Sequence, residues 1–261
     1  MIGGKSVADI RLNKASFDAA YQEYIIGSNF LEVPEYYHID KERYWQTIKF
    51  IHDAGLHTSE NIIEIGGGQI AILLTALFQS RCTVADISES FSQVFKKLEI
   101  PFHVGNLTQD PVVADDVKPF DLIIMLEVIE HIPVPPYRTF EMLKPLLKPQ
   151  GKIFLTTPNL FRLRNIIRMI IGRDIFDRFI LPMPGVGLGH QMEYSKDHLS
   201  WQFDHAGFAV DWMVHDQLGQ LGHTRRARFF RRLLSPLLLR KIWREELVAL
   251  ATRKAEPESL S

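Results

Sequence analysis

Short apolar runs alternate with stretches of helical length and spacing from residue 61 onward. The runs at 61–65, 82–87, 102–105, 120–126 and 152–157 are short enough to be buried strands. The stretches between them, at 70–78, 89–98 and 137–147, have the length and pattern of helices. Strands that alternate with helices are typical of a parallel, doubly wound sheet. We therefore expect an α/β fold.

The first 55 residues have a different pattern. They are rich in aromatic side chains, for instance Phe17, Tyr21 and Trp45, and residues 41–54 alternate at helical spacing, which predicts a helical cap packed on a sheet edge. Tyr36 and Tyr37 follow Pro34 in a loop-like stretch and are candidates for lining a ligand pocket.

The first predicted strand ends in a glycine turn, Glu64-Ile65-Gly66-Gly67-Gly68. Glycines accept positive φ and let a ligand approach the backbone, and the amides that open the next helix can donate to a polar group. Asp86 ends the second predicted strand, twenty residues after Gly66. This is the offset of an acid that binds a ribose diol, so the unit predicts a nucleoside-containing cofactor. Because Gly66, Gly68 and Ala71 also satisfy the dinucleotide fingerprint, a nicotinamide dehydrogenase stays an alternative.

Composition narrows the class of protein. The 261 residues are 46% hydrophobic and 23% charged, with a formal net charge of -1, so the chain can bury a large core and has no global bias toward nucleic acid. Cys82 is the single cysteine, which excludes an internal disulfide. The N-terminus has no apolar signal region and no long uncharged apolar run occurs, so we expect a cytoplasmic protein.

Taken together, these motifs resemble those of the class I S-adenosylmethionine-dependent methyltransferases. The glycine turn is similar to their E/D-x-G-x-G loop, and the resemblance extends to Glu127-Val128-Ile129-Glu130-His131 and to Thr156-Thr157-Pro158-Asn159. It covers about residues 40–253 and implies a Rossmann-like, seven-stranded, mostly parallel sheet of order 3-2-1-4-5-7-6. Residues 209–215 would be the sixth strand, and residues 246–254 would be the seventh, antiparallel strand. The implied parts are the cap at 1–55, a cofactor-binding half at 56–159, a lid insertion at 160–194, a C-terminal part at 195–254 and a tail at 255–261.

The same resemblance assigns cofactor contacts. Gly66, Gly67 and Gly68 would admit S-adenosylmethionine, and Glu64 would orient its amino acid end. The other implied cofactor contacts are Asp86 and Ile87 at the ribose, and Asn106 and Leu107 at the adenine. Glu127 would border the cofactor. The chain departs from the family at Ile70, where many members have a third glycine, and at Asn106, where an aspartate is common.

Glu127, Glu130 and His131 are candidates for the chemistry. Methylation of a neutral alcohol needs a base that removes its proton or a metal that lowers its pKa. We expect the spacing of these residues to place all three on one side of a helical turn. The E-x-x-E-H segment resembles that of ubiquinone-pathway O-methyltransferases, and together with His190-x-x-Glu193-Tyr194 it resembles small-RNA 2′-O-methyltransferases. By that resemblance Glu127, Glu130, His131 and His190 match a quartet for Mg²⁺ or Mn²⁺. The alternative is a metal-free site in which His131 is a base and His190 docks the lid.

These assignments predict an O-methyltransferase for a hydroxyl of a sugar, a glycan or another natural-product small molecule. Asn159, His190 and Tyr194 join Tyr36 and Tyr37 as candidate substrate contacts. Three alternatives remain: N-methylation of an amino sugar or small amine, methylation of a quinone or lipid-linked acceptor at the membrane, and a cofactor-binding scaffold without turnover.

Two basic stretches, 160–180 and 224–244, combine arginines with large apolar side chains. Such stretches often bury the apolar face on the sheet and solvate the charged one, and Pro236 divides the second into two short segments. Peripheral contact with the inner face of a membrane is the alternative. We do not expect nucleic acid as a partner, because the pattern does not indicate that the aromatic residues of these stretches are exposed for base stacking.

Overall fold

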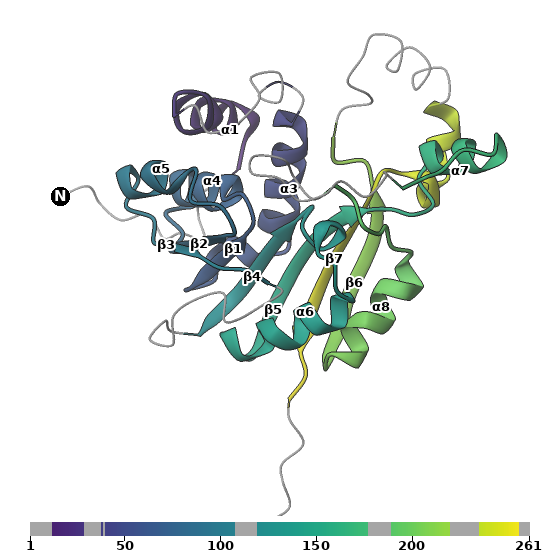
Figure 1. Ribbon diagram of the computed structural model, residues 1–261. Helices are drawn as coiled ribbons and strands as arrows, with labels where there is room; N and C mark the ends of the chain where they lie inside the picture. Colours follow the sequence, from purple (N-terminus) through teal and green to yellow (C-terminus); the bar gives the residue numbers. More distant parts are fainter. Residues whose placement is uncertain are drawn as a thin grey trace, which may run out of the picture. The chain divides into compact units, whose positions relative to one another are not determined.

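A seven-stranded sheet organises the computed structural model, which describes residues 12–28, 38, 40–107, 119–176, 189–219 and 235–255 (Figure 1). The strand order is β3-β2-β1-β4-β5-β7-β6, which confirms the predicted order. The strands are β1 (Ile62–Ile65), β2 (Cys82–Asp86), β3 (Phe102–Val104), β4 (Phe120–Leu126), β5 (Leu147–Pro158), β6 (Phe208–Asp216) and β7 (Glu246–Arg253).

Burial explains why these segments are strands. All four residues of β1 are buried, as expected for a short parallel strand covered on both faces. β2 runs parallel to β1 and β3, and β5 runs parallel to β4. β7 is antiparallel to both β5 and β6, which confirms the predicted placement of 246–254.

Strand β5 begins earlier than the sequence predicts. The preceding helix ends at Leu143, a 3-10 turn follows at Lys144–Leu146, and Leu147 already pairs with Phe120. The register then shifts, and regular pairing resumes at Lys152. Pro149 lacks an N–H for the ladder, and Gln150 has a φ of 66°, so these residues form the irregular part of the strand.

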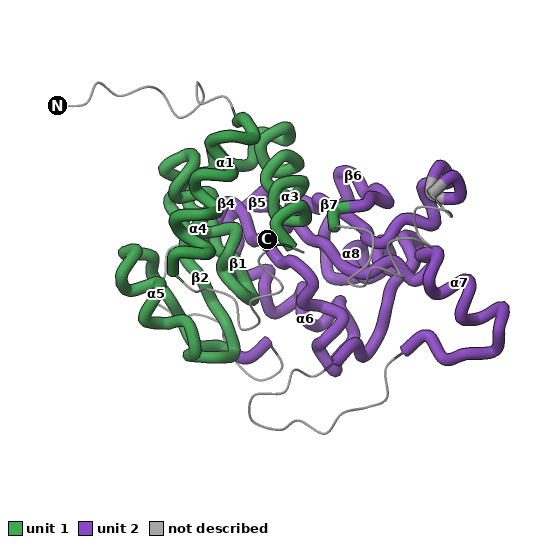
Figure 2. The backbone as a smooth tube through the Cα atoms, turned by 90° about the horizontal axis from the view of Figure 1, so that it is seen from above, with its two compact units in different colours: residues 1–105, 218–232 green, residues 106–217, 233–261 purple. Residues whose placement is uncertain are grey.

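The chain divides into two compact units, coloured green and purple in Figure 2. Unit 1 comprises residues 1–105 and 218–232, and unit 2 comprises 106–217 and 233–261. These bounds differ from the division expected from the sequence. Among the described residues, the α-helices of unit 1 are α1 (Lys14–Ala20), α3 (Lys41–Asp53), α4 (Gln69–Phe78) and α5 (Ser92–Lys97), and those of unit 2 are α6 (Pro136–Leu143), α7 (Leu163–Ile170) and α8 (Lys196–His205).

The N-terminal helices pack on a helix rather than on a sheet edge. Both α1 and α3 contact α4. The ring of Phe17 in α1 also packs against the ring of Trp45 in α3, with 5.2 Å between the centroids. The apolar face of these helices is thus buried against α4, whose own residues are mostly buried. Tyr36 and Tyr37 lie outside the described residues.

Among the described residues, no helix has the length and apolar character needed to cross a membrane.

Candidate functional site

The glycine turn after β1 has a backbone that side chains would disturb. Gly66, Gly67 and Gly68 have φ angles of 86°, 78° and 103°. A Cβ on Gly68 would lie 2.4 Å from Cζ of Phe95, so α4 packs closely on its neighbours at this point. Both properties agree with the predicted need for glycine at this turn.

Asp86 lies at this turn although it is distant in sequence. Its Oδ2 accepts a hydrogen bond from the amide of Gly67 at 2.7 Å, and Oδ1 accepts one from the amide of Ser88 at 2.8 Å. Parallel pairing of β1 and β2 explains the approach, because both strands end at the same sheet edge. The carboxylate is held by two amides and keeps further lone pairs for other donors.

Glu64 is the buried acid of the same turn. Only 1% of the residue is exposed, and its Oε2 accepts a hydrogen bond from the amide of Ala71 at 2.6 Å. Burial raises the pKa of Glu64 to about 8, and the charge of Asp86 adds to the rise. Hydrogen bonds from the amides at the start of α4 act to lower this pKa, because they stabilise the charged carboxylate.

The remaining predicted cofactor residues differ in exposure. Ile87, just after β2, is 63% exposed. Asn106 and Leu107 follow β3, and the first is half-buried while the second is buried.

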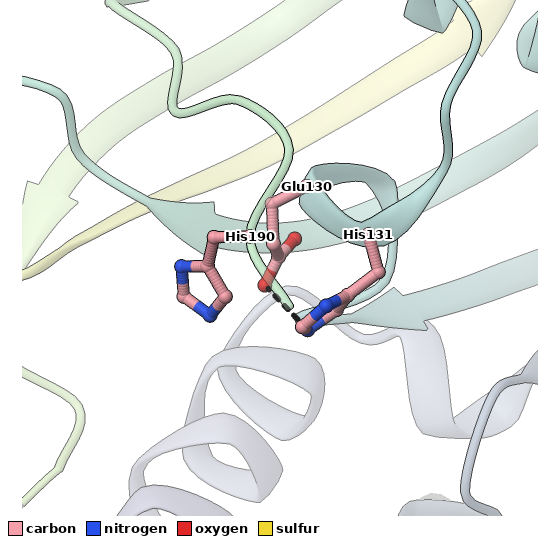
Figure 3. A group of neighbouring side chains, drawn as sticks. All are labelled: Glu130, His131 and His190. Carbon is pink, nitrogen blue, oxygen red and sulfur yellow. Dashed lines mark ion pairs between the residues drawn. The ribbon is translucent and has the colours of Figure 1, made fainter. Parts of the chain in front are cut away.

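Glu130, His131 and His190 form a cluster in unit 2 (Figure 3). Each offers one ligand atom, and these atoms all lie within 4.8 Å of one another. Glu130 is fully buried in the 3-10 turn Ile129–His131, and its Oε2 accepts a hydrogen bond from Oγ1 of Thr157 at 3.0 Å. Its Oε1 lies 3.9 Å from Nε2 of His131.

In each imidazole of the cluster, Nδ1 faces an oxygen atom of the protein. Nδ1 of His131 lies 2.8 Å from the carbonyl oxygen of Gly189, which assigns the hydrogen to Nδ1 and leaves the lone pair on Nε2. Nδ1 of His190 lies 3.6 Å from Oε1 of Glu193. The two rings meet edge to face at 4.8 Å between centroids.

Charge at His131 is disfavoured. Burial lowers the pKa of His131, and the neighbouring His190 acts in the same direction, although the Gly189 carbonyl and Glu127 oppose them. His131 is therefore neutral at neutral pH, as a base or a metal ligand must be.

Glu127 is not a member of the cluster. Its backbone is left-handed with a φ of 54°, and its Oε1 accepts a hydrogen bond from Oγ1 of Thr156 at 2.9 Å. The expected helical turn thus starts at Ile129 instead of Glu127. The prediction that Glu127, Glu130 and His131 share one side of a helix is wrong, because the left-handed residue breaks the helical path.

Glu193 supports the cluster, a role that the sequence did not reveal. It is buried, and its carboxylate accepts hydrogen bonds from Arg162 and from Nδ2 of Asn165. Burial alone would raise the pKa of Glu193, but the nearby His190, the charge of Arg162 and the Asn165 amide lower it overall. The three-residue spacing from His190 was the signal available for this contact.

Asn159, predicted as a substrate contact, joins segments of the protein. Its Nδ2 donates to the carbonyl oxygens of Ile242 and Arg244 at 2.7 and 2.8 Å, and its Oδ1 accepts from the amide of Phe161. Both amide hydrogens are therefore used within the protein. We assign Asn159 a positioning role in place of the substrate contact.

A cavity of about 410 Å³ lies in unit 2, partly lined by residues that follow His131 and His190 in the chain. Tyr194, a predicted substrate contact, is 1% exposed, lines this cavity and donates to the carbonyl oxygen of Ile129 at 3.4 Å. The lining residues are Ile132, Pro133, Val134, Pro135, Pro136, Gln191, Met192, Tyr194, His198 and Gln202.

Comparison with known proteins identifies a family whose sequence pattern matches most of this chain. A family described as a methyltransferase domain matches residues 36–211. The ubiquinone biosynthesis O-methyltransferase of Coxiella burnetii (strain RSA 493 / Nine Mile phase I) is 28% identical over 116 residues, which cover 43% of this chain. The match spans about half, 49%, of that relative's length.

Solved structures share the fold. The N-methyltransferase NodS from Bradyrhizobium japonicum WM9, in complex with S-adenosyl-L-homocysteine, has a TM-score of 0.51 at 14% identity, covering 92% of this chain and 99% of that chain. A putative methyltransferase in complex with the Haloferax volcanii Trm112 methyltransferase activator has a TM-score of 0.55 at 15% identity, covering 94% and 100%.

The family match includes the glycine turn, Asp86 and the Glu130–His131 pair, so the dehydrogenase alternative is set aside. The chain belongs to the methyltransferase-domain family and shares the fold of class I S-adenosylmethionine-dependent methyltransferases.

Proposed function

We propose that this methyltransferase acts on a hydroxyl that has a second hydroxyl beside it, on a sugar, a glycan or another natural-product small molecule. The observation that carries the proposal is the cluster of Glu130, His131 and His190. A divalent cation held there would bind adjacent hydroxyls and lower the pKa of the one that is methylated.

The cluster has the chemistry of a cation site. The carboxylate suits Mg²⁺ or Mn²⁺, and the two imidazoles favour a transition-metal ion such as Mn²⁺ over Mg²⁺. Ligating histidines commonly donate their other N–H to a carbonyl or a carboxylate, and Gly189 and Glu193 stand in those positions for His131 and His190. The buried Glu130 is oriented in turn by the hydroxyl of Thr157. Glu127 is left as a candidate neighbour of the cofactor.

The glycine turn fits the cofactor. S-adenosylmethionine supplies an electrophilic methyl group on a sulfonium. In our assignment the turn Gly66-Gly67-Gly68 admits it, Asp86 with Ile87 faces the ribose, and Asn106 with Leu107 faces the adenine. Glu64 orients the amino acid end from its buried position.

His131 has one of two roles. Its Nε2 either accepts the proton of the acceptor hydroxyl or ligates the cation, because one lone pair cannot do both. In both roles the hydrogen bond from Nδ1 to Gly189 sets the direction of Nε2.

A second acceptor class is favoured by the matched relative, which is named for ubiquinone biosynthesis. A phenol with a neighbouring hydroxyl offers the cation the same two oxygens as a sugar diol. The cluster therefore accommodates either acceptor, and the assay must include both.

Chelation of the purified enzyme tests the cation. We would measure methyl transfer from labelled cofactor to sugar diols, to phenols with adjacent hydroxyls and to amino sugars, before and after chelator treatment. We expect turnover of a diol, its loss after chelation, and recovery on addition of Mn²⁺ or Mg²⁺. The matched variants are Glu130→Gln in the cluster and Glu141→Gln on the exposed side of α6.

Each contrary outcome has a distinct meaning. Unchanged turnover after chelation would remove the cation from the proposal. Methylation of the amino sugar nitrogen alone would replace O-methylation by N-methylation. Cofactor binding without turnover of any acceptor would indicate a scaffold.

A further inference from the structure

We propose that unit 2 docks on an anionic membrane surface through an exposed basic and apolar region, residues 161–176 and 237–242. We call this region the docking face. It includes α7 and parts of the two 3-10 turns Ser235–Leu239 and Lys241–Trp243. It is independent of the cation proposed above.

Large apolar side chains on the docking face are open to solvent. Ile170 is 79% exposed and Leu239 is 83% exposed, the highest values among the large apolar residues described. An isolated exposed apolar side chain needs no explanation, but a group of them marks an interaction surface. The group consists of Phe161, Ile167, Met169, Ile170, Ile171, Phe176, Leu237, Leu239 and Ile242.

The charge of the docking face is positive. Arg164, Arg168, Arg173, Arg240 and Lys241 belong to it, and Asp174 is the single acidic residue within 161–176 and 237–242. Two cations next to these residues are already paired within the protein, Arg162 with Glu193 and Arg244 with Asp216. Arg168 donates to the carbonyl oxygen of Asp174, and the guanidinium of Arg240 lies 5.2 Å from the centroid of the Trp243 ring, so both still carry a charge that an anionic partner can neutralise.

Buried contacts hold the two segments of the docking face together. Nδ2 of Asn159 donates to Ile242 and Arg244, and Nη1 of Arg162 lies 3.4 Å from Oε2 of Glu245. In Figure 1, α7 and the 3-10 turns that follow residue 235, found by their yellow colour, lie on the same side of unit 2. The apolar residues of both segments can therefore meet one surface together.

A lipid surface fits this combination better than a second copy of the chain. Two docking faces in contact would bring like charges together, which costs free energy, whereas anionic headgroups would neutralise them. A bilayer interface also accepts scattered apolar side chains without a complementary shape. The partner is thus a membrane rich in anionic lipid.

Vesicle sedimentation of the full chain tests the proposal. We expect binding to phosphatidylcholine vesicles that contain phosphatidylglycerol, weaker binding as salt is added, and little binding to phosphatidylcholine alone. The double variant Ile170→Asp with Leu239→Asp should weaken partitioning at least about tenfold. Charge reversal by Arg173→Glu with Lys241→Glu should weaken it by about tenfold or more.

Matched controls separate docking from folding. Val104→Asp changes a side chain that is 55% exposed on β3, and Arg81→Glu changes an exposed arginine outside the docking face. Both should bind vesicles like the wild type, and every variant should keep its melting temperature and its affinity for S-adenosylhomocysteine. Absence of binding to anionic vesicles would overturn the proposal, and so would equal loss in the control variants. A dimer that Ile170→Asp dissociates, without vesicle binding, would identify the face as a self-association surface instead.

Discussion

Left-handed backbone angles occur at both loops that carry the candidate site. The three glycines after β1 have positive φ, and so does Glu127 after β4. A glycine adopts this region at little cost, whereas a glutamate does not. The strain at Glu127 is offset locally by its hydrogen bonds to the side chain and backbone of Thr156.

Gly68→Ala should be more damaging than a glycine substitution at an open site. Its Cβ would meet Phe95 at 2.4 Å, whereas a Cβ added to Gly55, which has a φ of 70°, would have nothing within 4 Å. We expect Gly55→Ala to cost about 1–2 kcal/mol of unfolding free energy from backbone strain alone. Gly68→Ala should add roughly 1–3 kcal/mol from overpacking. Urea unfolding of the two variants measures the difference, and equal losses would contradict the packing argument.

Glu64 should make stability depend on pH. Its pKa is raised from 4.5 to about 8 in the folded protein, so the unfolded chain loses this proton first. The stabilisation is complete below pH 4.5 and is lost as pH rises to about 8. Relative to Glu64→Gln, the wild type should lose up to about 1.4 kcal/mol per pH unit within that window. Urea unfolding of the cofactor-free proteins at several pH values measures this slope, and parallel curves for the two proteins would show that Glu64 does not titrate this way.

His131 should set the acid limit of activity. Burial lowers its pKa below the ordinary value of about 6.5, so the neutral ring persists at neutral pH. As pH falls through that lowered pKa, Nε2 of His131 is protonated. It then has no lone pair with which to act as a base or as a metal ligand. The pH profile of kcat/KM should therefore fall on the acid side, with its limb below about pH 6.5. A limb above that value would show that another group controls activity.

At the scale of elements, the candidate site depends on contacts between the end of the insertion, residues 189–194, and the segments that follow β4 and β5. The amide of Gln191 donates to the carbonyl oxygen of Glu130 at 2.7 Å, and Asn159 bridges to Tyr194 as an isolated parallel pair. These contacts bring His190 to the turn after β4. The buried ion pair Arg162–Glu193 connects the N-terminal end of α7 to the segment that carries His190.

Arg162→Met should weaken both the fold and the site. The substitution leaves the buried Glu193 carboxylate without its guanidinium, and breaking such a pair costs about 3–5 kcal/mol. Lys14→Met removes one partner of the exposed pair with Asp18 and should cost only about 0–1 kcal/mol. Chemical unfolding measures both. Mn²⁺ affinity should also fall for Arg162→Met, because Glu193 orients His190, and an unchanged affinity would separate the ion pair from the site.

At the scale of the whole molecule, cofactor binding should appear as stability. A ligand at a hundred times its Kd adds about 2.7 kcal/mol to the unfolding free energy. For a chain of this size we expect S-adenosylhomocysteine to raise Tm by roughly 5–10 °C under those conditions. Asp86→Ala should weaken cofactor binding by about 1–3 kcal/mol, which reduces the shift at fixed ligand.

The control for Asp86→Ala is Asp53→Ala, which removes a carboxylate that is 62% exposed on unit 1. Its thermal shift with S-adenosylhomocysteine should match that of the wild type. A full shift in Asp86→Ala would remove Asp86 from the cofactor site.

The sequence by itself determined the alternation of strands and helices from residue 61 onward, the glycine turn and the position of Asp86, whereas the order of strands in the sheet came from the family resemblance. Strand and helix periods, turn glycines and the spacing to the next strand are local features, so they can be read along the chain. The antiparallel placement of β7 came from the family resemblance, and the structure confirms it.

Tertiary structure decided which side chains meet. His131 and His190 come together because the insertion docks on the turn after β4, and no local period encodes that approach. Glu127 lies outside the cluster because its backbone is left-handed. Glu193 lies beside the cluster, where Arg162 and Asn165 donate hydrogen bonds to it. Such contacts depend on long-range packing of segments, whereas the pattern of apolar residues specifies only the faces that are buried.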